Sequence, residues 1–324
     1  MISRIYRNRL SYLQKKVYDV LVDGFTKMKP EIKVLCSDNG ILDTIIEYIR
    51  LDYPWIFFLG KIEYFINPIW RYIVVVPTYT YSEQQVDNLK TQLCIEQKKL
   101  ITKVSGKSVW DKLLCVHDIL CHSLEYRQIG FDSHSIIGPY IRKQSVCEGI
   151  AKSFKDICDC LDIESCIVIG KSKPSFDANF YEDHSWNQVN IDGDWVNIDT
   201  TFDLTLSAKN FIRHDYFCVP DNQIIKSHTK TKNNGIACET TRFDYFTVNG
   251  LLMRTQTHFV KFVQFKIEQG VSVFEVKLPS TGDIFSIENK IFTNMQKALE
   301  ILGVNKSFEI SVNKDMLVVL VRIL

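Results

Sequence analysis

The residues of this sequence best suited to chemistry are a cysteine, a histidine and an aspartate that occur in that order: Cys147, His184 and Asp199. A cysteine thiolate attacks carbonyl carbons, and a neighbouring histidine activates it by taking its proton. An aspartate behind the histidine fixes which ring nitrogen carries a proton. If the fold brings them together, these residue types predict acyl transfer on an amide through a thioester.

A predicted hairpin places the histidine and the aspartate. The segments HSWNQVNI and DWVNIDTTF have the pattern of two strands joined at Asp192-Gly193, a pair typical of tight hairpin turns. Asp199 then lies opposite Trp186, and alternation along the strands puts His184 and Asp199 on one face as diagonal neighbours, roughly 7 Å apart at the backbone. The other face is predicted to be core and collects Val189, Ile191, Val196 and Ile198.

Two further aspartates compete for the orienting role. Asp183 has the wrong strand parity to face His184, and Asp203 falls near the end of the second strand. Strand alternation therefore favours Asp199.

Cys147 stands where a helix is predicted to begin. It follows a polar loop, and the apolar residues after it recur at helical spacing. An isolated cysteine before an apolar helix is more often structural. However, unsatisfied backbone N–H groups and the helix dipole at this end favour a thiolate and could bind an oxyanion. Tyr140 and Gln144 are candidates for an additional side-chain donor.

The motifs around these residues resemble those of the transglutaminase-like superfamily of papain-like thiol enzymes. The run SVCEGIAKSFKDICDCLDIESCIVIG, followed by HSWNQVNIDGDWVNIDTTFD, is similar to bacterial transglutaminase-domain proteins with a C-x-G-x-A helix, an H-x-W-N strand and a W-x-x-x-D strand. The resemblance covers about residues 105 to 230. It implies that Cys147 is the nucleophile, His184 the general base and then acid, and Asp199 the orienting carboxylate.

Some neighbouring residues have both a structural and a functional interpretation. Trp186 is expected to pack beside the site and is a candidate for a wall of the substrate cleft. Tyr140 is a second candidate for substrate binding. His117 and Asp118, in the middle of a predicted helix, are interpreted as polar packing partners. The histidines at positions 122, 134 and 214 give no decisive signal, and only His134 precedes the cysteine closely enough to approach the cleft.

The pattern of elements predicts an α+β protein with three regions. Residues 1–104 have mainly helical periodicity, with one or two strands predicted over Trp70 to Tyr81, a stretch bounded by Pro68 and Pro77. Residues 105–235 form the papain/transglutaminase-like core, in which the nucleophile helix packs on an antiparallel sheet. Residues 236–324 are predicted to form a small α+β domain that closes with a β-hairpin.

The composition excludes several classes of partner. Of 324 residues, 46% are hydrophobic, and 39 lysines and arginines nearly balance 38 aspartates and glutamates. This balance favours neither nucleic acid nor an anionic membrane. The first ten residues are too charged for a secretory leader, so we expect a cytoplasmic protein. The ten cysteines lack paired C-x2-C spacing, so we expect no metal and no other cofactor.

The expected activity is thiol-dependent acyl transfer on peptide or glutamine-type amides. Water resolves the thioester in a cysteine protease or amidase, and an amine resolves it in a transglutaminase. The substrate would be a protein or peptide, and the sequence does not indicate an oligomeric state. The alternative is a catalytically silent domain of the same fold that acts as a protein-binding scaffold.

Overall fold

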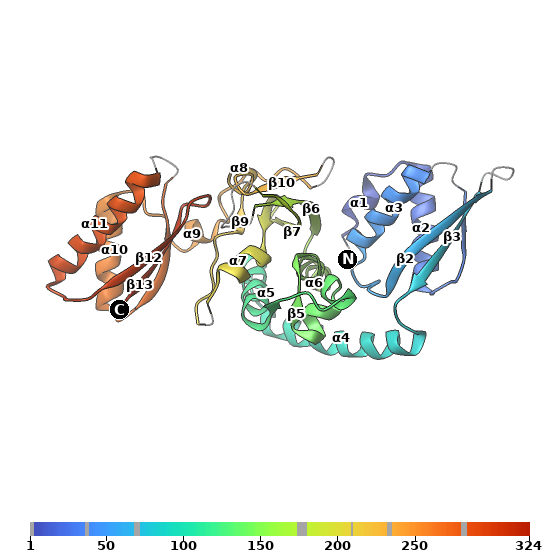
Figure 1. Ribbon diagram of the computed structural model, residues 1–324, viewed down its shortest axis with the longest axis horizontal. Helices are drawn as coiled ribbons and strands as arrows, with labels where there is room; N and C mark the ends of the chain where they lie inside the picture. Colours follow the sequence, from blue (N-terminus) through green and yellow to red (C-terminus); the bar gives the residue numbers. More distant parts are fainter. Residues whose placement is uncertain are drawn as a thin grey trace.

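The computed structural model describes residues 3–35, 39–67, 72–173, 180–208, 210–231, 235–279 and 284–324. Figure 1 shows three regions that follow one another along the long axis of the molecule, with the N-terminal region at one end and the C-terminal region at the other. Helices combine with three larger sheets whose strands are antiparallel, as the α+β prediction requires. The fold class is therefore confirmed.

The first region combines helices with an antiparallel sheet of order β1-β3-β2. Its elements are α1 (Ile5–Asn8), α2 (Tyr12–Thr26), β1 (Ile32–Val34), α3 (Asn39–Asp52), β2 (Leu59–Asn67) and β3 (Tyr72–Tyr79). β3 lies within the predicted range of Trp70 to Tyr81 and continues through Pro77, whereas Pro68 and Trp70 lie outside the described residues. Since β1 pairs with β3 only as far as Val75, one side of β3 is an edge beyond that point, where proline is tolerated.

Two capped helices lead into the core. α4 (Glu83–Val104) begins after Ser82, whose hydroxyl accepts from the backbone N–H of Gln85, and α5 (Val109–Ser123) begins after Ser108 in a similar way. Such caps satisfy N–H groups that the first turn of a helix leaves without partners. In Figure 1, α4 runs from the N-terminal region beneath the core.

The central sheet has the order β10-β6-β7-β8-β9 and is antiparallel throughout. Its strands are β6 (Ser165–Ser172), β7 (Glu182–Ile191), β8 (Asp194–Ile198), β9 (Phe217–Val219) and β10 (His228–Lys230). Helix α6 (Cys147–Cys160) packs on β7, where the Asn187 amide donates to the carbonyl of Ala151. The predicted arrangement of a nucleophile helix on an antiparallel sheet is present.

The β7–β8 hairpin has the predicted register over its paired residues. Asp192 and Gly193 adopt φ values of 54° and 91°, as a type I′ turn requires, and Val189 pairs with Val196. The predicted core face is buried, but the face that carries Trp186 is buried as well, because it packs into a second hydrophobic cluster.

The second predicted strand is too long at its C-terminal end. β8 stops at Ile198, and α7 (Thr200–Leu206) begins immediately after Asp199. The pairing of Asp199 with Trp186 is therefore wrong. The side chain of Asp199 caps α7, and this capping ends the strand where alternation alone would continue it.

Short elements connect these larger ones. They are the parallel pair β4 (Glu125–Tyr126) and β5 (Gln144–Ser145), the 3₁₀-helix η1 (Phe131–His134), the π-helix η2 (Gly138–Arg142), α8 (Asp221–Ile224) and α9 (Tyr245–Val248). The β4–β5 pair brings Tyr126 beside the chain that enters α6.

The last region has its own hydrophobic core between two helices and a sheet of order β11-β13-β12. Its elements are α10 (Gln256–Glu268), β11 (Val273–Lys277), α11 (Ile284–Leu302), β12 (Phe308–Asn313) and β13 (Val318–Ile323). The closing hairpin is confirmed, whereas α10 was not predicted. By contrast, one continuous core runs from Leu10 to Phe243 through the first two regions.

Among the described helices, none is long and apolar enough to cross a bilayer. The nine cysteines in the described part of the chain are all unpaired thiols.

Candidate active site

Asp199 is the centre of a buried hydrogen-bonding arrangement at the end of β8. Its Oδ1 atom accepts the backbone N–H groups of Thr201 and Phe202 at 2.9 and 3.0 Å. Its Oδ2 atom lies 2.6 Å from Nε2 of His184. Burial alone would raise the pKa of Asp199, but the charge and hydrogen bond of His184, together with a second histidine, hold it well below its ordinary value. The carboxylate is therefore ionised.

His184 lies between Asp199 and Cys147. Nε2 is engaged by Asp199, so Nδ1 is the ring nitrogen left for the Cys147 thiol, which is within hydrogen-bonding reach of this ring. Burial acts to lower the pKa of His184, but the charge and hydrogen bond of Asp199, and then Cys147, raise it to about 10. The structure thus brings the three predicted residues together and favours an imidazolium at neutral pH.

A second histidine, His228 on β10, shares the same carboxylate. Its Nε2 atom lies 2.8 Å from Asp199 Oδ2, and the Ser227 hydroxyl lies 2.8 Å from its other ring nitrogen. Burial lowers the pKa of His228 despite the neighbouring carboxylate, so this ring is neutral and donates to Asp199 through Nε2. The sequence does not predict a role for His228. No local motif marks it, since only the pairing of β10 with β6 brings it to the site.

The start of α6 is built around Gly149. A methyl group at this position would lie 2.3 Å from Ser145 Oγ and 2.4 Å from the Ser133 carbonyl oxygen, so only glycine lets the preceding loop pass this close. Among the described residues, no side chain caps α6. Apart from the N–H of Cys147, which meets the Tyr126 hydroxyl, the backbone N–H groups of its first turn are therefore available to a ligand.

Tyr126 on β4 is the second residue that the sequence analysis missed. Its hydroxyl accepts the backbone N–H of Cys147, and partial burial raises the pKa of Tyr126 to about 12 even though this hydrogen bond acts to lower it. The hydroxyl is therefore a neutral donor at physiological pH. Tyr126 also lines a cavity of about 440 Å³ together with Leu124, Leu204 and Thr205.

The other predicted contacts to substrate are not exposed. Trp186 is 1% exposed, stacks on the His184 ring and donates from its indole to Asn197. Tyr140 is 3% exposed, and its hydroxyl donates to the Ser153 carbonyl. Gln144 donates to Glu125. Trp186 and Tyr140 therefore support the site from within the protein and do not line a surface that a substrate can reach.

The competing aspartates and the loop histidine are also accounted for. The Asp183 side chain is 94% exposed and lies away from His184. Asp203 is buried but bonds to His117 and to the Tyr216 backbone. His134 pairs with Glu148 at 2.9 Å, one residue from the nucleophile position. Of the three aspartates, only Asp199 contacts His184.

A cysteine at the start of a helix that packs on an antiparallel sheet, with histidine and aspartate at the strand ends, is the arrangement of papain-like thiol enzymes. Residues 98–200 match the family model of the transglutaminase-like superfamily. The matched range contains Cys147, His184 and Asp199 but not His228.

Solved structures similar to this chain include a candidate cysteine protease from Cytophaga hutchinsonii and a transglutaminase. The first is 17% identical with a TM-score of 0.31 and matches 52% of this chain and 65% of its own. The second is 11% identical with a TM-score of 0.31 and matches 53% of this chain and 50% of its own. This chain therefore spans 65% and 50% of the lengths of these two structures. No curated protein matches the chain significantly.

Proposed function

We propose that this protein is an acyl-transfer enzyme that acts on peptide or glutamine-type amides through a Cys147 thioester. The observation that carries the proposal is the buried relay in which Asp199 holds His184 at 2.6 Å while the same ring reaches the Cys147 thiol. A carboxylate held ionised by buried donors stabilises the imidazolium that a thiolate needs as its partner.

The reaction would begin with attack of the Cys147 thiolate on the amide carbonyl. A carbon–sulfur bond forms and the carbonyl oxygen becomes an oxyanion beside the first turn of α6. The carbon–nitrogen bond then breaks, and the amine leaves with the proton from Nδ1 of His184. Water or a second amine attacks the thioester, gives its proton to His184 and releases the thiolate.

Tyr126 fits the role of the side-chain donor to the oxyanion. It is protonated at neutral pH and its hydroxyl lies at the N–H of Cys147. A donor placed where negative charge develops lowers the barrier by stabilising the transition state more than the substrate. The adjoining cavity, with its partly apolar lining, is the candidate position for the acyl side of the substrate.

Product analysis tests this proposal. Purified protein is incubated with glutamine-containing peptides, with and without a primary amine, and mass spectrometry scores cleavage, deamidation and amine incorporation. We expect the protein to catalyse at least one of these three reactions. Cys147→Ala and His184→Ala should each abolish it. The matched control is Cys94→Ala, since Cys94 is an exposed thiol on α4. Turnover that survives Cys147→Ala contradicts the proposal, and no turnover in any channel favours the scaffold alternative.

A further inference from the structure

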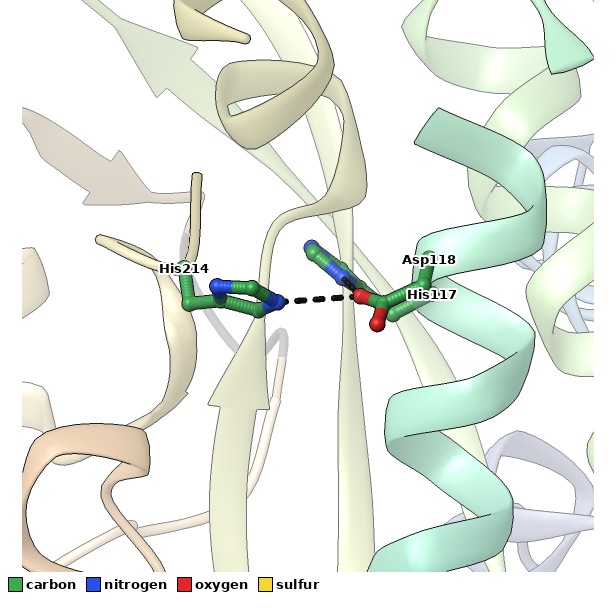
Figure 2. A group of neighbouring side chains, drawn as sticks. All are labelled: His117, Asp118 and His214. Carbon is green, nitrogen blue, oxygen red and sulfur yellow. Dashed lines mark hydrogen bonds and ion pairs between the residues drawn. The ribbon is translucent and has the colours of Figure 1, made fainter. Parts of the chain in front are cut away.

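A second group of histidines and carboxylates lies outside the triad, between α5 and the segment before β9. Figure 2 shows His117 and Asp118 on α5 and His214 on the facing segment, with contacts that converge on the Asp118 carboxylate. Asp118 Oδ1 lies 2.9 Å from His117 Nδ1 and 3.0 Å from His214 Nε2. The three atoms lie within 4.8 Å of one another.

Each imidazole of this group is held from behind by a buried carboxylate. Nε2 of His117 lies 3.1 Å from Asp203 Oδ2, and Nδ1 of His214 lies 2.7 Å from Glu275 Oε1. In metalloproteins, a histidine ligand usually donates its second ring N–H to a carboxylate or carbonyl, which fixes the tautomer and strengthens the ligand. Both rings of this cluster therefore have the outer partners of a metal ligand, and their inner nitrogens point toward one place.

The charges of the cluster also favour a cation. The cluster and its immediate neighbours hold four carboxylates, those of Asp118, Asp203, Asp215 and Glu275, and one guanidinium, that of Arg213. The Arg213 guanidinium makes two hydrogen bonds of 2.7 Å to Asp215 and lies 3.3 Å from Glu275. Carboxylates outnumber the guanidinium here, so these groups can compensate the charge of a bound cation.

We infer that His117 Nδ1, Asp118 Oδ1 and His214 Nε2 bind one divalent transition-metal ion of the Zn²⁺ type. Bonds of about 2.0–2.1 Å to a tetrahedral ion place neighbouring donors a little over 3 Å apart, close to the separations of 2.9 and 3.0 Å observed here. Two imidazoles and one carboxylate suit Zn²⁺ better than Mg²⁺ or Ca²⁺. Three protein ligands leave the fourth position for water.

The site is reachable and connects separate regions of the fold. The Asp118 side chain is 35% exposed, and a cavity of about 550 Å³ adjoins the cluster along His214, Tyr245 and Glu275. Glu275 belongs to β11, so a bound ion would link α5 to the C-terminal sheet through His214. Cysteine spacing did not predict this site, because the ligands are histidines and an aspartate, and Asp118 and His214 are 96 positions apart in the chain.

Metal titration of the full-length chain tests this inference. The protein carries Cys147→Ala so that the active-site thiol cannot bind metal, is stripped with a chelator, and is titrated with Co²⁺ by visible absorption and with Zn²⁺ by calorimetry. We expect saturable binding of one ion per chain. Glu275→Gln should weaken binding roughly 10- to 100-fold, as loss of an outer-shell partner does, and His214→Ala should weaken it at least as much.

The matched control is His122→Ala, which removes a histidine from the same helix but outside the cluster, and it should bind as tightly as the parent. If His214→Ala does not fold by circular dichroism, Asp118→Asn carries the test, since it keeps the side-chain shape and is partly exposed. The inference is overturned if the parent shows no saturable Co²⁺ spectrum. It is equally overturned if Asp118→Asn binds like the parent or if His122→Ala weakens binding as much. All samples lack the Cys147 thiol, so these outcomes are independent of the proposed catalysis.

Discussion

Replacing Asp199 with asparagine should remove the negative charge that keeps His184 protonated and should leave the fold unchanged. Asparagine is as good a helix cap as aspartate, so its carbonyl oxygen can still accept from Thr201 and Phe202 at the start of α7. The amide NH2 then takes the place of Oδ2 and faces Nε2 of both His184 and His228. The change is thus confined to charge and to the direction of two hydrogen bonds.

The size of the effect follows from the pKa of His184. Although burial opposes it, Asp199 and then Cys147 raise this pKa from 6.5 to about 10. Since a change of one in pKa corresponds to about 1.4 kcal/mol, the folded site favours the imidazolium by on the order of 5 kcal/mol. Because the folded pKa is the higher one, this stabilisation is present in full below pH 6.5 and is lost as the pH rises through about 10.

In Asp199→Asn, burial is no longer opposed by a carboxylate, so the pKa of His184 should fall to 6.5 or below. The asparagine NH2 donates to Nε2, which leaves the single ring proton on Nδ1, facing Cys147. A ring in this tautomer cannot take the thiol proton. Turnover at pH 7 should therefore fall by roughly 10³- to 10⁴-fold, similar to the loss when the aspartate of a serine-protease triad becomes asparagine.

Ring ¹⁵N NMR across a pH titration measures this directly, and His184→Gln identifies the resonances. The parent should titrate near pH 10 and Asp199→Asn at or below 6.5. Asp183→Asn is the matched control, because it neutralises an exposed neighbour that does not contact the ring, and it should titrate like the parent. If His184 in Asp199→Asn still titrates near pH 10, the Asp199 carboxylate is not what raises the pKa of His184.

Three further substitutions test parts of the site separately. Tyr126→Phe should lower kcat by roughly 10²- to 10³-fold, as loss of an oxyanion donor does, with little change in KM; equal kcat in stopped-flow assays would exclude this role. His228→Phe keeps an aromatic ring but removes one donor to a buried carboxylate, so urea unfolding at pH 7 should show a loss of about 1.5–3 kcal/mol, and an unchanged midpoint would argue against the shared carboxylate. Gly149→Ala should cost about 1–3 kcal/mol or more, because its methyl group meets the Ser133 carbonyl; calorimetry that finds an unaltered Tm would contradict that packing.

Local patterns were sufficient for the parts of the site that depend on neighbouring residues in the chain. The start of α6 at Cys147 and the register of the β7–β8 hairpin follow from helical spacing and from the Asp192-Gly193 turn. Strand alternation selects Asp199, although this residue is the cap of a helix. The prediction agrees with the structure because strand alternation and helix capping both place the side chain at the end of β8 beside His184.

The residues that were missed depend on contacts between distant segments. His228 reaches Asp199 only because β10 pairs with β6, and Tyr126 reaches Cys147 only because β4 pairs with β5. Neither strand is longer than three residues, so neither has a periodicity that a sequence can display. The same holds for His117 and His214, whose shared partner is visible only in the folded chain.

The most direct test of the account is the alkylation rate of individual thiols at pH 6, measured by mass spectrometry of the iodoacetamide-labelled peptides. Cys94, exposed on α4, is the internal reference for an ordinary thiol. The account predicts that Cys147 is labelled far faster than Cys94 in the parent and that His184→Ala removes this difference. Equal rates for the two thiols in the parent, or a fast rate that persists in His184→Ala, would contradict activation of Cys147 by the imidazolium of His184.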